Sequence, residues 1–228
     1  MSETAVASRD PSRVEFIVLV AALMALNALA IDVMLPALPY MGEALGVSHE
    51  NERQFVVGVY MLGFGVAQLA FGPLTDRFGR RGPLFVGLVI YVICAFAATF
   101  APNFAVLLGL RFVQGLGAAG TRVIATAVVR DRFSGREMAE IMALTFMIFM
   151  AIPILAPGIG QVILLTGPWQ HIFLFMGGLA TLIGLWAFFR LPETMHPEYR
   201  RPLSFASVFD GFRIVLTNRS ALLYGLAG

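Results

Sequence analysis

Six long apolar runs dominate this sequence, and each is long enough to cross a bilayer as a helix. They cover residues 14–40, 54–72, 82–100, 104–129, 138–166 and 172–190, with charged stretches or glycine and proline clusters between them. A hydrocarbon core needs about 20 apolar residues per helical span. Barrel strands would alternate in polarity over about 10 residues, which these runs do not do. We therefore expect an all-α integral membrane protein, and 58% hydrophobic residues agree with it.

The apolar runs divide the chain into three predicted regions. Residues 1–191 are expected to form a six-span transmembrane bundle. Residues 192–219 contain prolines and several arginines and are expected to form a cytoplasmic linker, whose end resembles a surface helix. Residues 220–228 read as the start of a seventh span.

The arginines indicate how the spans are oriented, because basic residues accumulate in cytoplasmic loops. They lie before the first run, between the second and third, between the fourth and fifth, and after the sixth. The links on the opposite side carry only Arg53. We expect a cytoplasmic N-terminus, which also places the stretch 72–81 on the cytoplasmic side.

Three charged residues fall at membrane depth, where each costs at least about 2.5–3.5 kcal/mol and suggests function or pairing. Asp32 in the first run and Arg111 in the fourth each lie about 12 Å from the outer ends of their runs, at 1.5 Å per residue. We expect the two to meet, so that Asp32 takes up a proton or cation. A static ion pair, or an Arg111 satisfied by carbonyl groups, stays open. Arg122 is expected to extend towards the headgroups.

The fifth run combines helix-bending residues with methionines. Pro153 and Pro157 each remove a backbone donor, and Gly160 follows one turn later, so we predict a kinked hinge beside a cavity. Met147 and Met150 would suit an adaptable apolar surface for varied ligands, although core filling is the alternative.

Several classes of protein lack their required residues here. No phosphate-binding G-x-x-x-x-G-K-[ST] loop and no H-E-x-x-H motif occurs, and Cys94 is the only cysteine. The serines fall in tails, links or span edges, and Asp32 is the only acid at membrane depth, which disfavours intramembrane proteases. We expect no enzymatic activity, no cofactor, no metal and no nucleic-acid partner.

Four motifs resemble one transporter family. "GPLTDRFGRR" (72–81) matches the loop signature G-x-x-x-D-[RK]-x-G-[RK]-[RK] of the major facilitator superfamily. "RFVQGLGAA" (111–119) resembles that family's fourth-span motif, and "LPET" (191–194) resembles the close of its sixth span. "IDVMLPALP" (31–39) is similar to the first span of Bcr/CflA-type multidrug antiporters. The fifth-span antiporter motif matches only in part. The loop signature is supplied by Gly72, Asp76, Arg77, Gly79, Arg80 and Arg81.

The resemblance implies the N-terminal half of the major facilitator fold, working by alternating access. Asp32 would be the site that binds protons or cations, and Arg111 would tune the pKa of Asp32. Gln114, Met147 and Met150 would line the substrate cavity. The loop signature would form a cytoplasmic gate. It implies a proton-coupled exporter of drugs or other small amphipathic compounds in the bacterial inner membrane. Its partners would be membrane lipid and a C-terminal six-span half or a second copy. A symporter that imports a small metabolite and a non-transporting scaffold or partner subunit are the alternatives.

Overall fold

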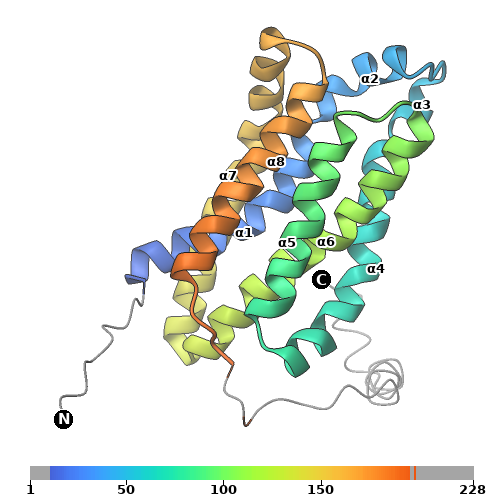
Figure 1. Ribbon diagram of the computed structural model, residues 1–228. Coiled ribbons are helices and arrows are strands. Elements are labelled where there is room, and N and C mark those ends of the chain that lie inside the picture. The colour runs from blue at the N-terminus through green and yellow to red at the C-terminus, as the bar shows by residue number, and fades with distance from the viewer. Residues whose placement is uncertain (1–10, 196–197, 199–228) are drawn as a thin grey trace, which may run out of the picture.

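The structure, a computed structural model, describes residues 11–195 and 198, and every regular element in this part is a helix (Figure 1). Six helical stretches are long and apolar enough to cross a membrane, which confirms the six predicted spans. The predicted seventh span, and the predicted linker apart from residues 192–195 and 198, lie outside the described residues. The elements are α1 (Arg13–Asp32), η1 (Leu35–Ala37), α2 (Leu38–Ala44), α3 (Glu50–Arg53), α4 (Phe55–Phe78), α5 (Arg81–Ala98), α6 (Phe104–Arg132), α7 (Gly135–Thr166) and α8 (Gln170–Arg190).

The link predicted between the second and third spans is mostly helix. α4 continues to Phe78, so only Gly79 and Arg80 separate it from α5. Pro73 lies inside α4, and nearby the hydroxyl of Thr75 donates to the carbonyl of Gly72 at 2.9 Å. The helix ends where Gly79 adopts a φ of 84°, a left-handed region that favours glycine. The sequence prediction ended the span too early because the polar residues here lie on the last turns of a helix.

α6 is the central helix of the bundle and packs most extensively against α4 and α5. Glycines make the α4–α6 contact close. A Cβ on Gly115 would overlap the carbonyl oxygen of Tyr60, and a Cβ on Gly63 would overlap that of Phe112. Small residues at such crossings let two backbones approach, which is a main source of helix association in membranes.

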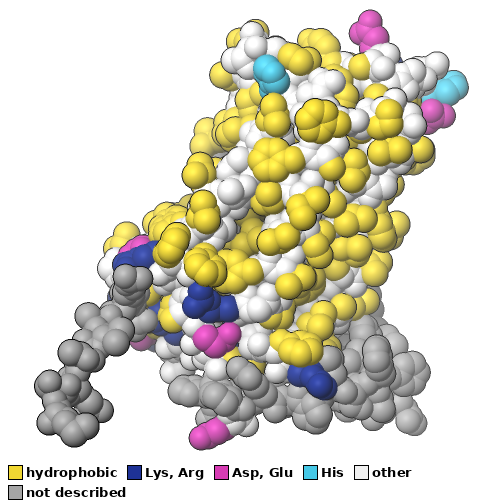
Figure 2. Space-filling view, viewed as in Figure 1, with side chains coloured by type: hydrophobic (Ala, Val, Ile, Leu, Met, Phe, Trp, Pro, Cys, Tyr) yellow, Lys and Arg dark blue, Asp and Glu magenta, His cyan; other side chains and the backbone are white. Residues whose placement is uncertain are grey.

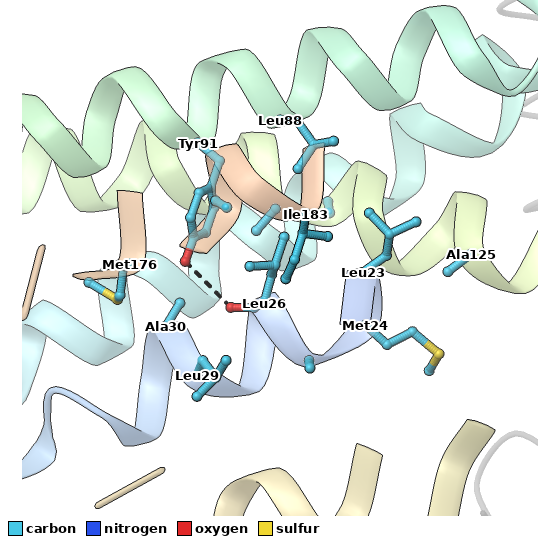
Figure 3. Close-up of a cluster of buried hydrophobic side chains, with 14 of the residues drawn as sticks. Leu23, Met24, Leu26, Leu29, Ala30, Leu88, Tyr91, Ala125, Met176 and Ile183 are labelled. Atoms are coloured by element: carbon cyan, nitrogen blue, oxygen red, sulfur yellow. Dashed lines mark hydrogen bonds between the residues drawn. The ribbon is translucent and has the colours of Figure 1, made fainter. Parts of the chain in front are cut away.

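α1 is the most enclosed span, whereas α7 is the most exposed. In the most apolar window of each span, 72% of the α1 residues are buried but only 11% of the α7 residues. Figure 3 shows Leu23, Leu26 and Ala30 of α1 facing Tyr91 of α5 and Ile183 of α8. The hydroxyl of Tyr91 donates to the carbonyl of Leu26 at 3.4 Å. The core therefore forms around α1 and α6, and one long face of α7 is left open.

The surface has the pattern of a protein that spans a bilayer. Figure 2 shows hydrophobic side chains along the length of the face formed by α5 and α8, while charged side chains gather towards the two ends. The exposed apolar residues on this face include Val86, Val89, Ile93, Leu185 and Phe188. Such a band suits contact with lipid chains, and the charged ends suit the two headgroup layers.

Candidate functional site

Arg111 lies at the centre of the bundle and is completely buried. Its guanidinium donates to the carbonyl of Ala30 on α1 at 2.8 Å and to the carbonyl of Val56 on α4 at 3.3 Å. It also donates to Oε1 of Gln114, one turn along α6, at 2.8 Å. A planar group with five donors suits this arrangement, because it can reach acceptors on several helices at once.

Two aromatic rings complete the surroundings of Arg111. Its Cζ lies 4.3 Å from the ring centroid of Tyr60 on α4 and 5.9 Å from that of Phe173 on α8. A guanidinium over an aromatic face is stabilised by the ring quadrupole, more so away from water. Arg111 therefore contacts α1, α4, α6 and α8 and joins four spans.

The predicted meeting of Asp32 with Arg111 does not occur in this structure. Within residues 11–195, Asp32 makes no hydrogen bond or ion pair, and Arg111 instead contacts the backbone two residues earlier, at Ala30. Counting residues along a span gives a depth, but it does not give the direction in which a side chain points. At 100° per residue, Asp32 points about 200° away from the buried face that contains Ala30. Asp32 is half-buried at the end of α1, and its role in proton coupling stays a prediction.

A second polar contact lies next to Arg111 and was missed from the sequence. The hydroxyl of Tyr60 donates to Oδ1 of Asn27 at 2.9 Å, and both side chains are buried. An asparagine in the middle of an apolar run is the signal that could have found it, because buried polar groups need a partner. Gln114 is fully buried too, and its Nε2 has no hydrogen-bond partner. Its amide faces Arg111, and its predicted part in substrate binding is untested.

A polar cavity of about 400 Å³ lies between α4 and α6, towards the end of the bundle that carries the loop signature. Gln68 of α4 lines it together with Arg122 and Thr126 of α6, and Asp76 and Arg80 of the signature line it too. The guanidinium of Arg122 lies 5.8 Å from the ring centroid of Phe149 on α7, and its predicted extension towards the headgroups stays a prediction. The cavity thus brings polar side chains of two spans together with the charged signature.

The loop signature forms an ion-pair cluster around Arg80. Its guanidinium contacts Asp131, at the end of α6, at 2.8 Å, and Asp76 at 2.9 Å, and it donates to the hydroxyl of Thr75 at 3.0 Å. Burial disfavours the charged guanidinium, but hydrogen bonds and attraction from Asp131 and Asp76 outweigh burial and raise the pKa of Arg80 above its ordinary value. Arg80 therefore stays charged and ties the end of α4 to the end of α6.

Glu193 adds the segment after α8 to this cluster. Its carboxylate accepts from the backbone N–H of Arg80 at 2.9 Å and from that of Arg81 at 3.1 Å. These groups lie at the start of α5, where a negative charge is favoured. The hydroxyl of Thr194 donates to Asp131 at 2.9 Å. The contribution of Asp131 was missed, and the motif "LPET" marked the segment that holds Glu193 and Thr194 without showing their contacts.

The remaining signature residues have separate places. Arg77 is exposed and lies over the ring of Phe78, at 5.4 Å from its centroid. Arg81 donates to the carbonyl of Phe188 on α8 at 2.7 Å. Gly72 lines the polar cavity.

α7 stays helical through both of its prolines, Pro153 and Pro157. Gly160 packs against the end of α1, where a Cβ would overlap the carbonyl oxygen of Val33. Met147 and Met150 are 67% and 68% exposed, so they lie on the open face of α7 rather than in the described core. Their place agrees with an adaptable surface, while the hinge and cavity roles stay predictions.

The part of the chain that the structure describes holds no group of three or more His, Cys, Asp or Glu side chains arranged to bind a metal ion. What the arrangement offers instead is a buried cation, a half-buried carboxylate and a polar cavity, which are means of binding and charge movement within a membrane.

Comparison with known proteins connects this arrangement to transport. The profile described as "Major Facilitator Superfamily" matches residues 20–228. The chain is 36% identical over 184 residues to "Multidrug resistance protein MdtL" of Klebsiella pneumoniae (strain 342), covering 79% of this chain and 47% of that protein. It is 32% identical over 203 residues to "Uncharacterized MFS-type transporter YdgK" of Bacillus subtilis (strain 168), covering 88% and 50%.

A solved structure supports the same fold. The human organic anion transporter MFSD10 (TETRAN) superimposes with a TM-score of 0.69 at 24% sequence identity, over 94% of this chain and 55% of the other. The chain spans about half the length of the curated relatives it matches.

Proposed function

The chain belongs to the major facilitator superfamily, and from this premise we propose that it supplies the first six-span half of a proton-coupled multidrug exporter. The exporter would lie in a bacterial inner membrane with the N-terminus of this chain in the cytoplasm. Two six-span bundles would alternate in opening a central site to either side. Small amphipathic compounds would leave as protons enter.

The observation that carries this proposal is Asp32, which is half-buried and has no hydrogen bond or ion pair with the residues that the structure describes. An acid at membrane depth is costly and is kept where it binds protons, cations or substrate. Its nearest predicted partner, Arg111, already has three acceptors and two aromatic rings. Asp32 is therefore not held in a static pair with Arg111, and its carboxylate can change protonation without breaking that central cluster.

The polar cavity supports the presence of a second bundle. Gln68 and Arg122 belong to spans, yet they line a cavity of about 400 Å³ with Thr126. Polar groups at this depth face protein or a water-filled space rather than lipid chains. The open face of α7 adds a long apolar surface beside it. A second six-span unit, from further along the same chain or from a second copy, would enclose both.

The experiment that tests the proposal is proton-coupled transport in inside-out vesicles from cells that express the whole gene. Fluorescent lipophilic compounds serve as probes, and an imposed proton gradient drives uptake into the vesicles. Asp32→Asn keeps the size of the side chain but removes its charge, so we expect gradient-driven uptake, and proton release on addition of the probe, to be lost. Unchanged proton release in Asp32→Asn would overturn the proposal.

A matched control removes an acid at the same end of the bundle. Glu50 is exposed and lies in α3, outside the core, so the Glu50→Gln variant should transport normally.

The same vesicles also test the direction of transport. If the proton gradient empties the vesicles of the probe instead of filling them, the protein imports the probe, which contradicts the direction proposed here.

A further inference from the structure

An apolar groove runs between α5 and α8 on the outside of the bundle, away from the polar cavity. Its volume is about 250 Å³. Along α5 the lining extends from Phe85 to Ile93, which is about 12 Å at 1.5 Å per residue. The hydroxyl of Thr181, its one polar side chain, donates to the carbonyl of Gly177 in its own helix. The other lining residues include Leu88, Val89, Val92, Gly184 and Leu185.

One end of the groove carries a positive charge held in a fixed position. Phe85 and Phe188 line this end, and their rings meet edge to face with centroids 5.5 Å apart. The guanidinium of Arg81 lies over both rings, 5.6 Å from the centroid of Phe85 and 5.5 Å from that of Phe188. It also donates to the carbonyl of Phe188 at 2.7 Å, which uses one of its five donors.

The nearby acid does not neutralise Arg81 by a direct side-chain pair. Glu193 directs its carboxylate to the backbone N–H groups of Arg80, Arg81 and Met195. No ion pair joins the guanidinium of Arg81 to a carboxylate anywhere in residues 11–195. Several of its donors thus remain for an anion at the level where α5 begins and α8 ends.

We propose that this groove binds an anionic phospholipid, with part of one acyl chain between α5 and α8 and the headgroup phosphate on Arg81. The apolar lining matches the chain, and a guanidinium matches a phosphate in both charge and geometry. The groove lies on the face that Figure 2 shows covered with hydrophobic side chains, whose lower end carries charged ones. A second copy suits the groove less well, because a two-fold contact here would bring two Arg81 side chains together at the same end.

Native mass spectrometry of the complete chain in detergent, titrated with phosphatidylglycerol or with phosphatidylcholine of the same acyl chains, tests the proposal. We expect phosphatidylglycerol to bind about fivefold more tightly, the size expected for one basic side chain at an anionic headgroup. Arg81→Gln keeps a donor but removes the charge and should abolish this preference, whereas Arg81→Lys should keep most of it. Glycerol phosphate, which has no acyl chains, should not compete.

Two further variants separate the groove from general attraction to basic residues. Arg77→Gln removes an exposed charge from the same signature but not from the groove, so the lipid preference should remain. Val89→Phe fills the groove from an exposed position on α5 and should weaken the binding of both lipids. Gly184→Leu should have the same effect from α8, where an added Cβ has its nearest neighbour at 3.7 Å. Circular dichroism checks that each variant stays helical.

Three results would overturn the proposal. The first is equal affinity for the two lipids. The second is a loss of the preference for phosphatidylglycerol in Arg77→Gln that is as large as in Arg81→Gln. The third is unchanged lipid binding in Val89→Phe and Gly184→Leu when both variants fold normally. A mass of two chains that Val89→Phe converts to one would assign the groove to a second copy instead.

Discussion

At the scale of single residues, Arg111 shows how a charge can be buried without an acid. Its contacts are two backbone carbonyls, one amide oxygen and two rings, and the described part of the chain provides no carboxylate for it. Carbonyl dipoles on several helices replace the counter-ion, so the charge depends on the helices staying in place. The weak point is Gln114, which supplies an acceptor on one side and leaves its Nε2 without a partner on the other.

The first prediction follows from that imbalance at Gln114. Gln114→Glu removes the unpartnered donor and gives Arg111 a carboxylate, so we expect the bundle to become more stable, by about 1 kcal/mol. Gln114→Leu removes the acceptor and should destabilise it by about 2 kcal/mol. Thermal unfolding in detergent measures both variants. If Gln114→Leu is more stable than the original protein, or if Gln114→Glu lowers the stability as much as Gln114→Leu is expected to, then Arg111 does not depend on the Oε1 atom of Gln114.

At the scale of whole helices, α7 makes a close backbone contact with the end of α1 near its own C-terminal end, while much of its outer face stays exposed. Gly160 touches the end of α1, which is the segment that contains Asp32. Gly158, half a turn away, has no atom within 4 Å of an added Cβ. The two glycines of one helix therefore differ in what they do: Gly160 permits a helix contact, and Gly158 faces open space.

The second prediction compares these two glycines. Gly160→Ala would force α7 away from Val33, and such overpacking costs about 1–3 kcal/mol. Gly158→Ala meets nothing and should leave stability unchanged or raise it slightly, because alanine is the better helix former. Thermal unfolding of the two variants measures the difference. If both behave alike, the contact between α7 and the end of α1 is not the tight one seen here. In the whole transporter, loss of activity in Gly160→Ala alone would link this contact to movement near Asp32.

At the scale of the whole molecule, hydropathy alone predicted the six spans, because lipid imposes length and apolar character on each one. The residues of the loop signature could also be identified from the sequence. What could not be read was which partners the fold brings to Arg80, since Asp131 and Glu193 lie 51 and 113 residues away in sequence. The same limit explains Asp32: counting residues gives depth, whereas the rotation of a helix depends on packing against its neighbours.

The last prediction concerns how the first span is tied to the sixth. Glu15 near the start of α1 accepts two bonds of 2.5 Å from the guanidinium of Arg190 at the end of α8, and a third of 3.3 Å from Nε1 of Trp186. A bidentate ion pair of this kind combines charge attraction with a fixed hydrogen-bond geometry. It joins positions 175 residues apart and closes the bundle at the end that carries the signature.

Exchanging the charges tests whether this pair holds the bundle closed. Glu15→Arg or Arg190→Glu alone places like charges together and should lower the unfolding temperature, while the double variant should recover much of the loss. The control is the same exchange at Arg13 and Glu140, a pair of 3.1 Å between α1 and α7 whose side chains are 48% and 58% exposed. Exposed ion pairs contribute little to stability, so exchanging these two charges should change the unfolding temperature little. Thermal unfolding at low and high salt measures both sets. A double variant no more stable than the two single variants would mean that the Glu15–Arg190 pair does not hold α1 to α8, because recovery requires that the opposite charges themselves attract each other.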